Sequence, residues 1–164
     1  MAGVPFCKNM KQIKLTQGKY AIVDNDDYKE LNKHKWYLLD GRYAARVSWR
    51  KGDSLGFLMH RIILKVKKEE KCDHINNNGL DNRKQNLRIC TLTQNQGNRI
   101  KQKNNTSGFK GVCLDKKSNK WKSAIHIKSV TKCLGRYKDK IEAAKEYDKA
   151  AKKYFGEFAR LNFN

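Results

Sequence analysis

The sequence predicts an α+β protein made of small antiparallel units, and three observations lead to this prediction. Short alternating runs separated by turn signals extend over residues 11–64 and indicate a β-rich N-terminal segment. Two strand patterns and a capped helix pattern follow over residues 72–99. Three further alternating runs and one amphipathic helix pattern occupy residues 107–164, which predicts a three-stranded antiparallel sheet packed on one helix.

The N-terminal segment is predicted from its turns. Residues 11–24 alternate around Gly18, and residues 36–49 turn at Asp40 and Gly41. Asp-Gly between two alternating runs is a strong hairpin signal. A last apolar run, residues 54–64, ends the segment. We therefore expect several short strands before residue 64.

The central unit reads as strand, strand and helix. A first strand is predicted around residues 72–75 and a second over residues 86–91, with a loop rich in asparagine between them. Thr91 is a candidate N-cap for the helix, because Gln94 stands three residues later, at the spacing of a capping box.

The C-terminal unit is predicted to be a three-stranded meander followed by a helix. The strands are expected over residues 110–114, 121–127 and 131–137. Asp139 and Glu142 mark the start of the helix and Gly156 its end. Residues 101–106 lack apolar periodicity and read as a linker between residues 1–100 and 107–164. The apolar face of the helix comprises Ile141, Ala144, Tyr147, Ala151 and Phe155.

Charge indicates the kind of partner. The 164 residues contain 37 Lys+Arg and 16 Asp+Glu, a formal net charge of +21 that both halves share. Such an excess favours nucleic acid over a mere solvated surface, and no run is apolar enough to span a bilayer. Five cysteines without a C-x-x-C pair favour reduced thiols in a cytosolic compartment over a zinc ribbon or a disulfide framework.

Asp73 and His74 are the candidate catalytic pair of the central unit. A neutral imidazole accepts a proton near physiological pH, so His74 is a candidate general base for cutting a phosphodiester. Adjacent strand residues point to opposite faces, which does not by itself bring the two side chains together. The alternative is that Asp-His and the following asparagines only form turns.

A resemblance favours the catalytic interpretation. The stretches MHRIIL and CDHINNNGLDNRKQNLRICTLTQNQGN, residues 59–64 and 72–98, resemble the HNH endonucleases, most closely the intron-encoded homing nucleases of bacteriophages, which have a ββα-metal fold. The resemblance implies that His74 is the general base and that Asp73 binds one divalent metal. It implies that Asn86 orients the base through its side-chain oxygen and that Asn95, where the family often has histidine, is the second metal ligand.

The implied metal is Mg²⁺ or Mn²⁺, one ion per active site, because a carboxylate and an amide oxygen form a hard donor set. The resulting hypothesis is a one-metal mechanism in which His74 deprotonates water and a 5′-phosphate is left. The resemblance also places a histidine, His60, on a strand preceding the motif. His60 is either a structural residue or a phosphate contact.

A second resemblance covers residues 106–163. The stretches GFKGV, LGRY, EAAKEYDKAA and FGEFARLNF resemble the DNA-binding domain of plant ethylene-response factors, the AP-two fold, whose sheet lies in the major groove. Trp121 is equally a candidate core residue. Lysines where the plant domains often have arginine imply anchoring more than stringent base readout. The candidate DNA contacts are Lys110, Lys120, Trp121, Lys122, His126, Lys128 and Arg136.

The N-terminal segment adds basic residues that alternate with aromatics, a pattern that can bind phosphates or form a small core. Trp36 is favoured as core and Trp49 stays open. The candidate DNA contacts here are Arg42, Arg46, Arg50 and Lys51.

The sequence thus predicts a monomeric, metal-dependent, site-specific homing endonuclease of double-stranded DNA that cuts one or both strands. The resemblance also implies a phage-encoded protein acting in the cytoplasm of a bacterial host. The alternative is a non-catalytic, sequence-specific DNA-binding regulator with a degenerate HNH core. An RNA-binding protein is less favoured, because no stretch resembles the common RNA-binding modules.

Overall fold

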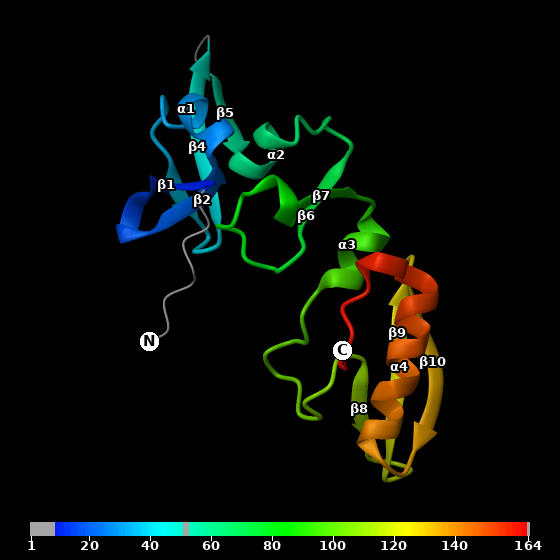
Figure 1. Cartoon of the computed structure of the whole chain (residues 1–164). Helices are drawn as coiled ribbons and strands as arrows, with labels where there is room; N and C mark the ends of the chain where they lie inside the picture. Colours follow the sequence, from blue (N-terminus) through cyan, green and yellow to red (C-terminus); the bar gives the residue numbers. More distant parts are fainter. Residues whose placement is uncertain (1–8, 51–52, 164) are drawn as a thin grey trace. The chain divides into compact units, whose positions relative to one another are not determined.

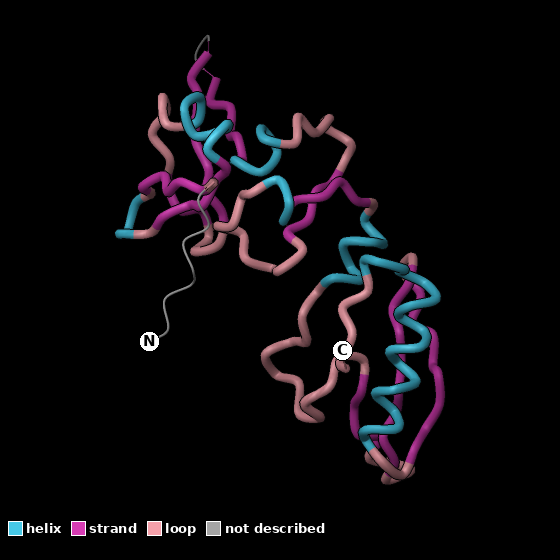
Figure 2. The backbone as a smooth tube through the Cα atoms, viewed as in Figure 1, coloured by secondary structure: helices cyan, strands magenta, loops and turns pink. Residues whose placement is uncertain are grey.

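The computed structural model describes residues 9–50 and 53–163 (Figure 1). The chain forms two compact units, one ending at Cys90 and the other beginning at Thr91. Each unit is mixed α/β with small antiparallel sheets, as the cyan helices and magenta strands of Figure 2 show. This boundary precedes the linker predicted at residues 101–106, so the helix after Thr91 belongs to the C-terminal unit. Within the described residues, no helix combines the length and apolar character needed to cross a membrane.

The N-terminal unit begins with a hairpin of β1 (Met10–Lys14) and β2 (Tyr20–Asp24). Gln17 and Gly18 both have positive φ, 59° and 66°, in the connecting turn. Glycine is suited to this conformation because it has no Cβ to clash with the backbone. The turn predicted at Gly18 is confirmed.

A second sheet has the order β3-β4-β5, with β3 at Tyr37–Leu39, β4 at Tyr43–Arg50 and β5 at Asp53–Leu58. Asp40 and Gly41 connect β3 to β4 with φ angles of 51° and 64°. Leu39 pairs with Tyr43, and the Arg42 N–H closes the turn on the Leu39 carbonyl at 2.9 Å. Positive φ at both central residues of this turn suits the twist of a β-hairpin. The hairpin predicted at Asp-Gly is therefore confirmed.

Two short helices pack with these sheets: α1 (Asn25–Leu31) and α2 (Met59–Ile63). Trp36 is buried, as predicted, and its ring nitrogen donates a hydrogen bond of 2.8 Å to the Leu31 carbonyl. Leu80, from the central loop, packs against the same core. The buried apolar core of the unit comprises Ile13, Leu15, Ala21, Val23, Leu31, Trp36, Leu38, Ala44 and Met59.

The strands predicted in the central unit are present as β6 (Lys71–His74) and β7 (Leu87–Cys90), which pair antiparallel. The loop between them is fastened to β2. Ile22 donates its N–H to the Leu80 carbonyl at 2.8 Å and accepts from the Asn82 N–H at 2.7 Å. This loop is therefore part of the N-terminal fold and not an independent appendage.

The C-terminal unit starts with α3 (Leu92–Asn98). The Thr91 hydroxyl accepts from the Gln94 N–H at 3.2 Å, and the Gln94 side chain accepts from the Thr91 N–H at 2.8 Å. The predicted capping box is confirmed.

The remaining strands are β8 (Val112–Asp115), β9 (Lys120–Ile127) and β10 (Val130–Tyr137), in the order β10-β9-β8. Helix α4 (Lys140–Phe155) lies along one face of this sheet (Figure 1). Asp139 caps the helix by accepting from the Glu142 N–H, and Gly156 ends it with φ 55°. The predicted sheet and helix are both confirmed, although Ile141 is exposed.

Candidate active site

His74 is the last residue of β6 and is buried, with 6% of its surface exposed. Its Nε2 lies 3.4 Å from the side-chain oxygen of Asn82. The ring of His60 meets it edge to face, with 4.8 Å between ring centres, and the ring of Tyr43 lies 5.9 Å away. The imidazole is thus held among two rings and an amide.

Burial favours the neutral form of both histidines. Burial lowers the pKa of His60 to about 3, and the nearby charges of His74 and Arg61 act in the same direction. Burial also lowers the pKa of His74, while the Asn82 hydrogen bond and the charge of Asp73 offset part of this effect. A neutral imidazole carries one nitrogen lone pair, so His74 can accept a proton.

Asp73 precedes His74 on β6 and is also buried. It pairs in register with Arg88 of β7, whose Nε and Nη2 lie 3.2 and 3.0 Å from the same oxygen, Oδ2. Asp73 and His74 contact different groups, as expected for neighbours on a strand. Arg88 provides a positive partner for the Asp73 carboxylate.

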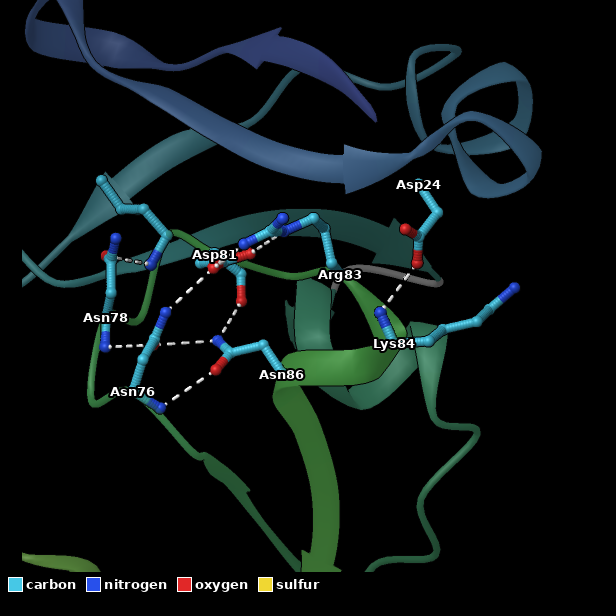
Figure 3. Close-up of polar contacts among 8 residues, drawn as sticks. Asp24, Asn76, Asn78, Asp81, Arg83, Lys84 and Asn86 are labelled. Atoms are coloured by element: carbon cyan, nitrogen blue, oxygen red, sulfur yellow. Dashed lines mark hydrogen bonds and ion pairs between the residues drawn. The ribbon is translucent and has the colours of Figure 1, made fainter. Parts of the chain in front are cut away.

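Asn86 organises the loop between the two strands (Figure 3). Its Nδ2 donates to the Asn76 side-chain oxygen at 2.9 Å and to the Asp81 carbonyl at 2.8 Å. Its oxygen accepts from the Asn76 N–H at 3.0 Å. The Asn86 side-chain oxygen, predicted to orient His74, accepts a backbone N–H of the loop, and the amide whose oxygen lies near His74 Nε2 is that of Asn82.

The Asp81 carboxylate completes this network. It accepts from Arg83 at 2.8 and 2.7 Å and from the Asn76 amide at 2.9 Å. Burial alone would raise the pKa of Asp81, but the hydrogen bonds and charge of Arg83 lower it below the ordinary value. At the other end, the Lys84 N–H donates to Asp24 at 2.8 Å (Figure 3). The loop is rigidly anchored at both ends.

Asn95, the predicted second metal ligand, lies on α3 in the C-terminal unit and is half-buried. Its backbone N–H donates to the Thr91 carbonyl at 3.0 Å, as in a regular helix. His60, predicted on a strand, lies on α2 instead. That prediction was wrong because the β5 strand ends at Leu58 and the chain turns into a helix.

The chain is similar to a curated viral protein. Over 152 residues it is 32% identical to an uncharacterized HNH endonuclease of Acanthamoeba polyphaga mimivirus, covering 89% of this chain and 76% of the relative. The chain belongs to the HNH endonuclease family. No family profile and no solved structure matches it.

A divalent metal is the usual cofactor of HNH endonucleases. Residues 9–50 and 53–163 contain no cluster of three or more His, Cys, Asp and Glu side chains that could hold a metal. Asp73 nevertheless fits a hard cation, because Mg²⁺ is commonly bound by one or two carboxylates together with waters and substrate phosphates. Asp73 is thus the candidate carboxylate ligand.

The basic residues of the N-terminal unit have different environments. Arg42 is exposed, its guanidinium lies 5.2 Å from the centre of the Tyr43 ring, and its charge contributes to lowering the pKa of His74. Arg46 is half-buried, with its guanidinium 4.9 Å from the Phe57 ring and 5.8 Å from the Trp36 ring. It is therefore engaged inside the fold. The side chains of Arg50 and Trp49, and all of Lys51, lie outside the described part of the chain.

Helix α4 packs on one face of the C-terminal sheet, and within the described residues the opposite face is left uncovered by a helix. Trp121 packs against the core formed by Val112, Ala143 and Ala144, which corresponds to the core alternative for this residue. Side chains alternate along β9, so Lys120, Lys122 and His126 lie on the opposite face. Lys128 follows β9 in the turn with φ 46°.

Two other predicted contacts are already engaged within the protein. The Lys110 Nζ donates to the Gly97 carbonyl at 2.6 Å, and burial with the charges of Arg160 and Arg99 lowers the pKa of Lys110 to about 8. Lys110 precedes β8 instead of lying on a strand. Arg136 forms an ion pair of 2.6 Å with Asp115.

A cleft of about 580 Å³ lies in the C-terminal unit. Its walls come from the segment after α3, from the sheet and from α4. Four of the lining residues carry basic groups, and several others are amides. The basic ones are Arg99, Lys101, Lys110 and His126. Sequence reasoning did not single out Arg99 or Lys101, because they stand in a stretch without strand or helix pattern.

The sequence also missed Asn82 and Tyr43 as neighbours of His74. Asn82 was assigned to turn formation, and its backbone does bond to Ile22. For Tyr43, the sequence signal is Gly79. A Cβ added at this position would collide with the Tyr43 ring and the Arg42 carbonyl. Such a close approach explains a glycine only once the fold is known.

Proposed function

We propose that this HNH endonuclease is a divalent-metal-dependent enzyme that hydrolyses phosphodiester bonds in double-stranded DNA, with His74 as the general base. The observation that carries the proposal is the buried imidazole of His74, held by Asn82 and His60, with Asp73 as the preceding residue of the same strand. A base of this kind and an adjacent hard ligand are what hydrolysis of a phosphodiester requires.

His74 takes a proton from the attacking water as the water oxygen forms a bond to phosphorus. The bond from phosphorus to the 3′-oxygen breaks, which leaves a 5′-phosphate and, after proton uptake, a 3′-hydroxyl. Asp73 would hold the divalent ion. When bound, that ion supplies positive charge for the developing 3′-oxyanion. Burial of His74 keeps the base unprotonated before the reaction.

The finer features of the proposal are a homing-type choice of site, a one-metal course and a cut that nicks one strand. They are supported by the His74, Asn86 and Asn95 pattern after Asp73 in the sequence. Asn95 is proposed as a metal ligand on this sequence pattern alone, and loss of metal-dependent cutting in Asn95→Ala with retained DNA binding would support that role.

DNA binding by the C-terminal unit is the second part of the proposal. The uncovered sheet face, with Lys120, Lys122 and His126, and the basic cleft beside it provide positive charge for the phosphate backbone. A sheet of this kind also fits the major groove. Arg42 is proposed to contact phosphate near the reacting bond, because it is exposed and its charge reaches His74.

Cutting of supercoiled plasmid DNA tests the function. We expect the purified chain to convert supercoiled plasmid to nicked or linear DNA with Mg²⁺ or Mn²⁺, and a chelator to stop the reaction. His74→Ala should remove cutting but keep DNA binding in a gel-shift assay. If the wild-type chain shifts DNA and never cuts it with either metal, the alternative of a non-catalytic DNA-binding regulator holds.

A further inference from the structure

We propose that Asn82 is the positioning residue of His74: its side-chain oxygen accepts the Nε2–H of the imidazole and fixes the tautomer whose lone pair lies on Nδ1. This inference rests on the proposed function in one respect, because it assumes that His74 is the general base. It departs from the family resemblance, which gives the orienting role to Asn86.

Imidazole chemistry links the contact to the reacting atom. A neutral histidine has one ring nitrogen that donates and one that accepts, and the partner of one nitrogen decides the role of the other. The Asn82 oxygen lies 3.4 Å from Nε2 of His74. With a proton on Nε2, the lone pair that removes a proton from water is on Nδ1.

The position of Asn82 is fixed by its surroundings. Asn82 is 0% exposed, and its backbone N–H donates to the Ile22 carbonyl at 2.7 Å. The Ile22 N–H in turn donates to the Leu80 carbonyl. Strand β2 therefore holds the backbone on both sides of Asp81, and the Asn82 amide has little freedom to move away from the His74 ring.

Asn82 and Asn86 have different roles. The Asn86 amide holds the loop together through Asn76 and Asp81, with its oxygen on the Asn76 N–H. Asn82 supplies the contact to the base. Loss of Asn86 should therefore loosen the loop, whereas loss of Asn82 should change the chemistry of the ring.

The contact of 3.4 Å is longer than an ordinary N–H···O bond. The distance between His74 Nε2 and the Asn82 oxygen should shorten during the reaction. Protonation converts the ring to an imidazolium, whose Nε2–H donates a stronger, charge-assisted hydrogen bond than the neutral ring does. The Asn82 oxygen thus favours the protonated product of the base step. The Nδ2 of Asn82 is buried without a hydrogen-bond partner. The alternative arrangement is therefore the flipped amide, in which Nδ2 faces His74 and donates to Nε2.

The first test reads the tautomer directly and requires no cutting activity. Nitrogen-15 NMR of the metal-free, full-length protein distinguishes a protonated ring nitrogen from one with a lone pair, and His74→Gln identifies the His74 signals. We expect the proton on Nε2. A proton on Nδ1 would mean that the Asn82 amide is turned over and donates to Nε2, and would overturn the proposal whether or not the protein is a nuclease.

The second test uses substitutions of similar volume. Asn82→Asp keeps an oxygen acceptor and should retain the Nε2–H tautomer and cutting within about tenfold. Asn82→Leu has no acceptor and should give mixed tautomers, with KM unchanged and kcat reduced on the order of 10²- to 10⁴-fold, the range that general acid–base catalysis contributes. Equal tautomer populations and kcat in Asn82→Leu and the wild type would refute the assignment.

Asn86→Asp is the matched control. We expect it to lower the unfolding temperature and to leave the Nε2–H tautomer of His74 unchanged. A changed tautomer in Asn86→Asp with an unchanged one in Asn82→Leu would return the orienting role to Asn86 and overturn the proposal. If Asn82→Leu does not fold, the wild-type and Asn82→Asp spectra still decide the question.

Discussion

The imidazole rings of His60 and His74 meet edge to face, with 4.8 Å between their centres and 76° between their planes. His60 comes from α2 and His74 from β6, so the contact joins two separate elements of the N-terminal unit. Tyr43 closes the group from β4, with its ring 5.5 Å from His60. His60 therefore limits the orientations of the His74 ring without carrying charge itself.

Substitutions of His60 distinguish the role of its aromatic ring from the role of its ring nitrogens. His60→Phe keeps an aromatic edge against His74 and removes Nδ1, which is buried without a hydrogen-bond partner. We expect little loss of cutting, within about tenfold, and a gain of stability of up to about 1 kcal/mol. His60→Ala should lose about 2–4 kcal/mol because it leaves a cavity. Urea unfolding and plasmid cutting measure both effects.

Abolished cutting in a correctly folded His60→Phe variant would contradict this view. It would show that a His60 nitrogen takes part in the reaction and contacts substrate or water.

Acid should destabilise the N-terminal unit through the same residue. In the unfolded chain His60 takes up a proton near pH 6.5, whereas in the folded chain it does so only near its pKa of about 3. Between these values the unfolded state binds more protons, so stability is lost as the pH falls from 6.5 towards 3. One such group contributes about 1.4 kcal/mol per pH unit.

Urea unfolding at several pH values measures this dependence. His74 has a lowered pKa too and acts in the same direction. The difference between wild type and His60→Phe isolates His60, and we expect a shallower pH dependence in the variant. Identical slopes in the two proteins would show that His60 is protonated in the folded state as readily as in the unfolded one.

Asn86 should matter mainly for stability. Asn86→Ala removes three hydrogen bonds of 2.8–3.0 Å and leaves the Asp81 carbonyl without this partner. Each buried group left unsatisfied costs about 1–3 kcal/mol, so thermal unfolding should show a clear loss. Asn78→Ala is the control: its exposed side chain accepts a hydrogen bond from the nearby Leu80 N–H, and we expect a loss below about 1 kcal/mol. A larger effect of Asn78→Ala than of Asn86→Ala would be inconsistent with the network.

Local patterns predicted the secondary structure well, because each signal acts within a few residues. Asp40-Gly41, the Thr91 capping box and the Asp139 cap all specify hydrogen bonds or φ angles of their own neighbourhood. The contact of Asn82 with His74 could not be predicted this way. It depends on the bonds from residues 80–82 to Ile22, which is distant in sequence. Several loop asparagines have equal claims until those bonds are known.

The sequence also does not determine which basic side chains are exposed. Alternation along β9 predicts which lysines share a face, but it does not show which face the helix covers. Lys110 and Arg46 read as surface charges in the sequence. The structure has Lys110 on the Gly97 carbonyl and Arg46 beside the rings of Phe57 and Trp36.

The last prediction compares lysines on the two faces of the C-terminal sheet. Lys122 lies on the uncovered face, whereas the Lys132 Nζ donates to the Tyr154 hydroxyl of α4 on the covered face, at 2.9 Å. If the uncovered face binds DNA, Lys122→Ala should weaken binding and reduce the slope of log affinity against log salt by about 1, because one phosphate contact is lost. Lys132→Ala removes the same charge from the chain but no DNA contact, so its slope should equal that of the wild type.

Fluorescence anisotropy with a labelled duplex between about 50 and 200 mM salt measures both slopes. Equal losses in the two variants would mean that the DNA responds only to total charge, and a loss confined to Lys132→Ala would place the DNA on the helix side of the sheet.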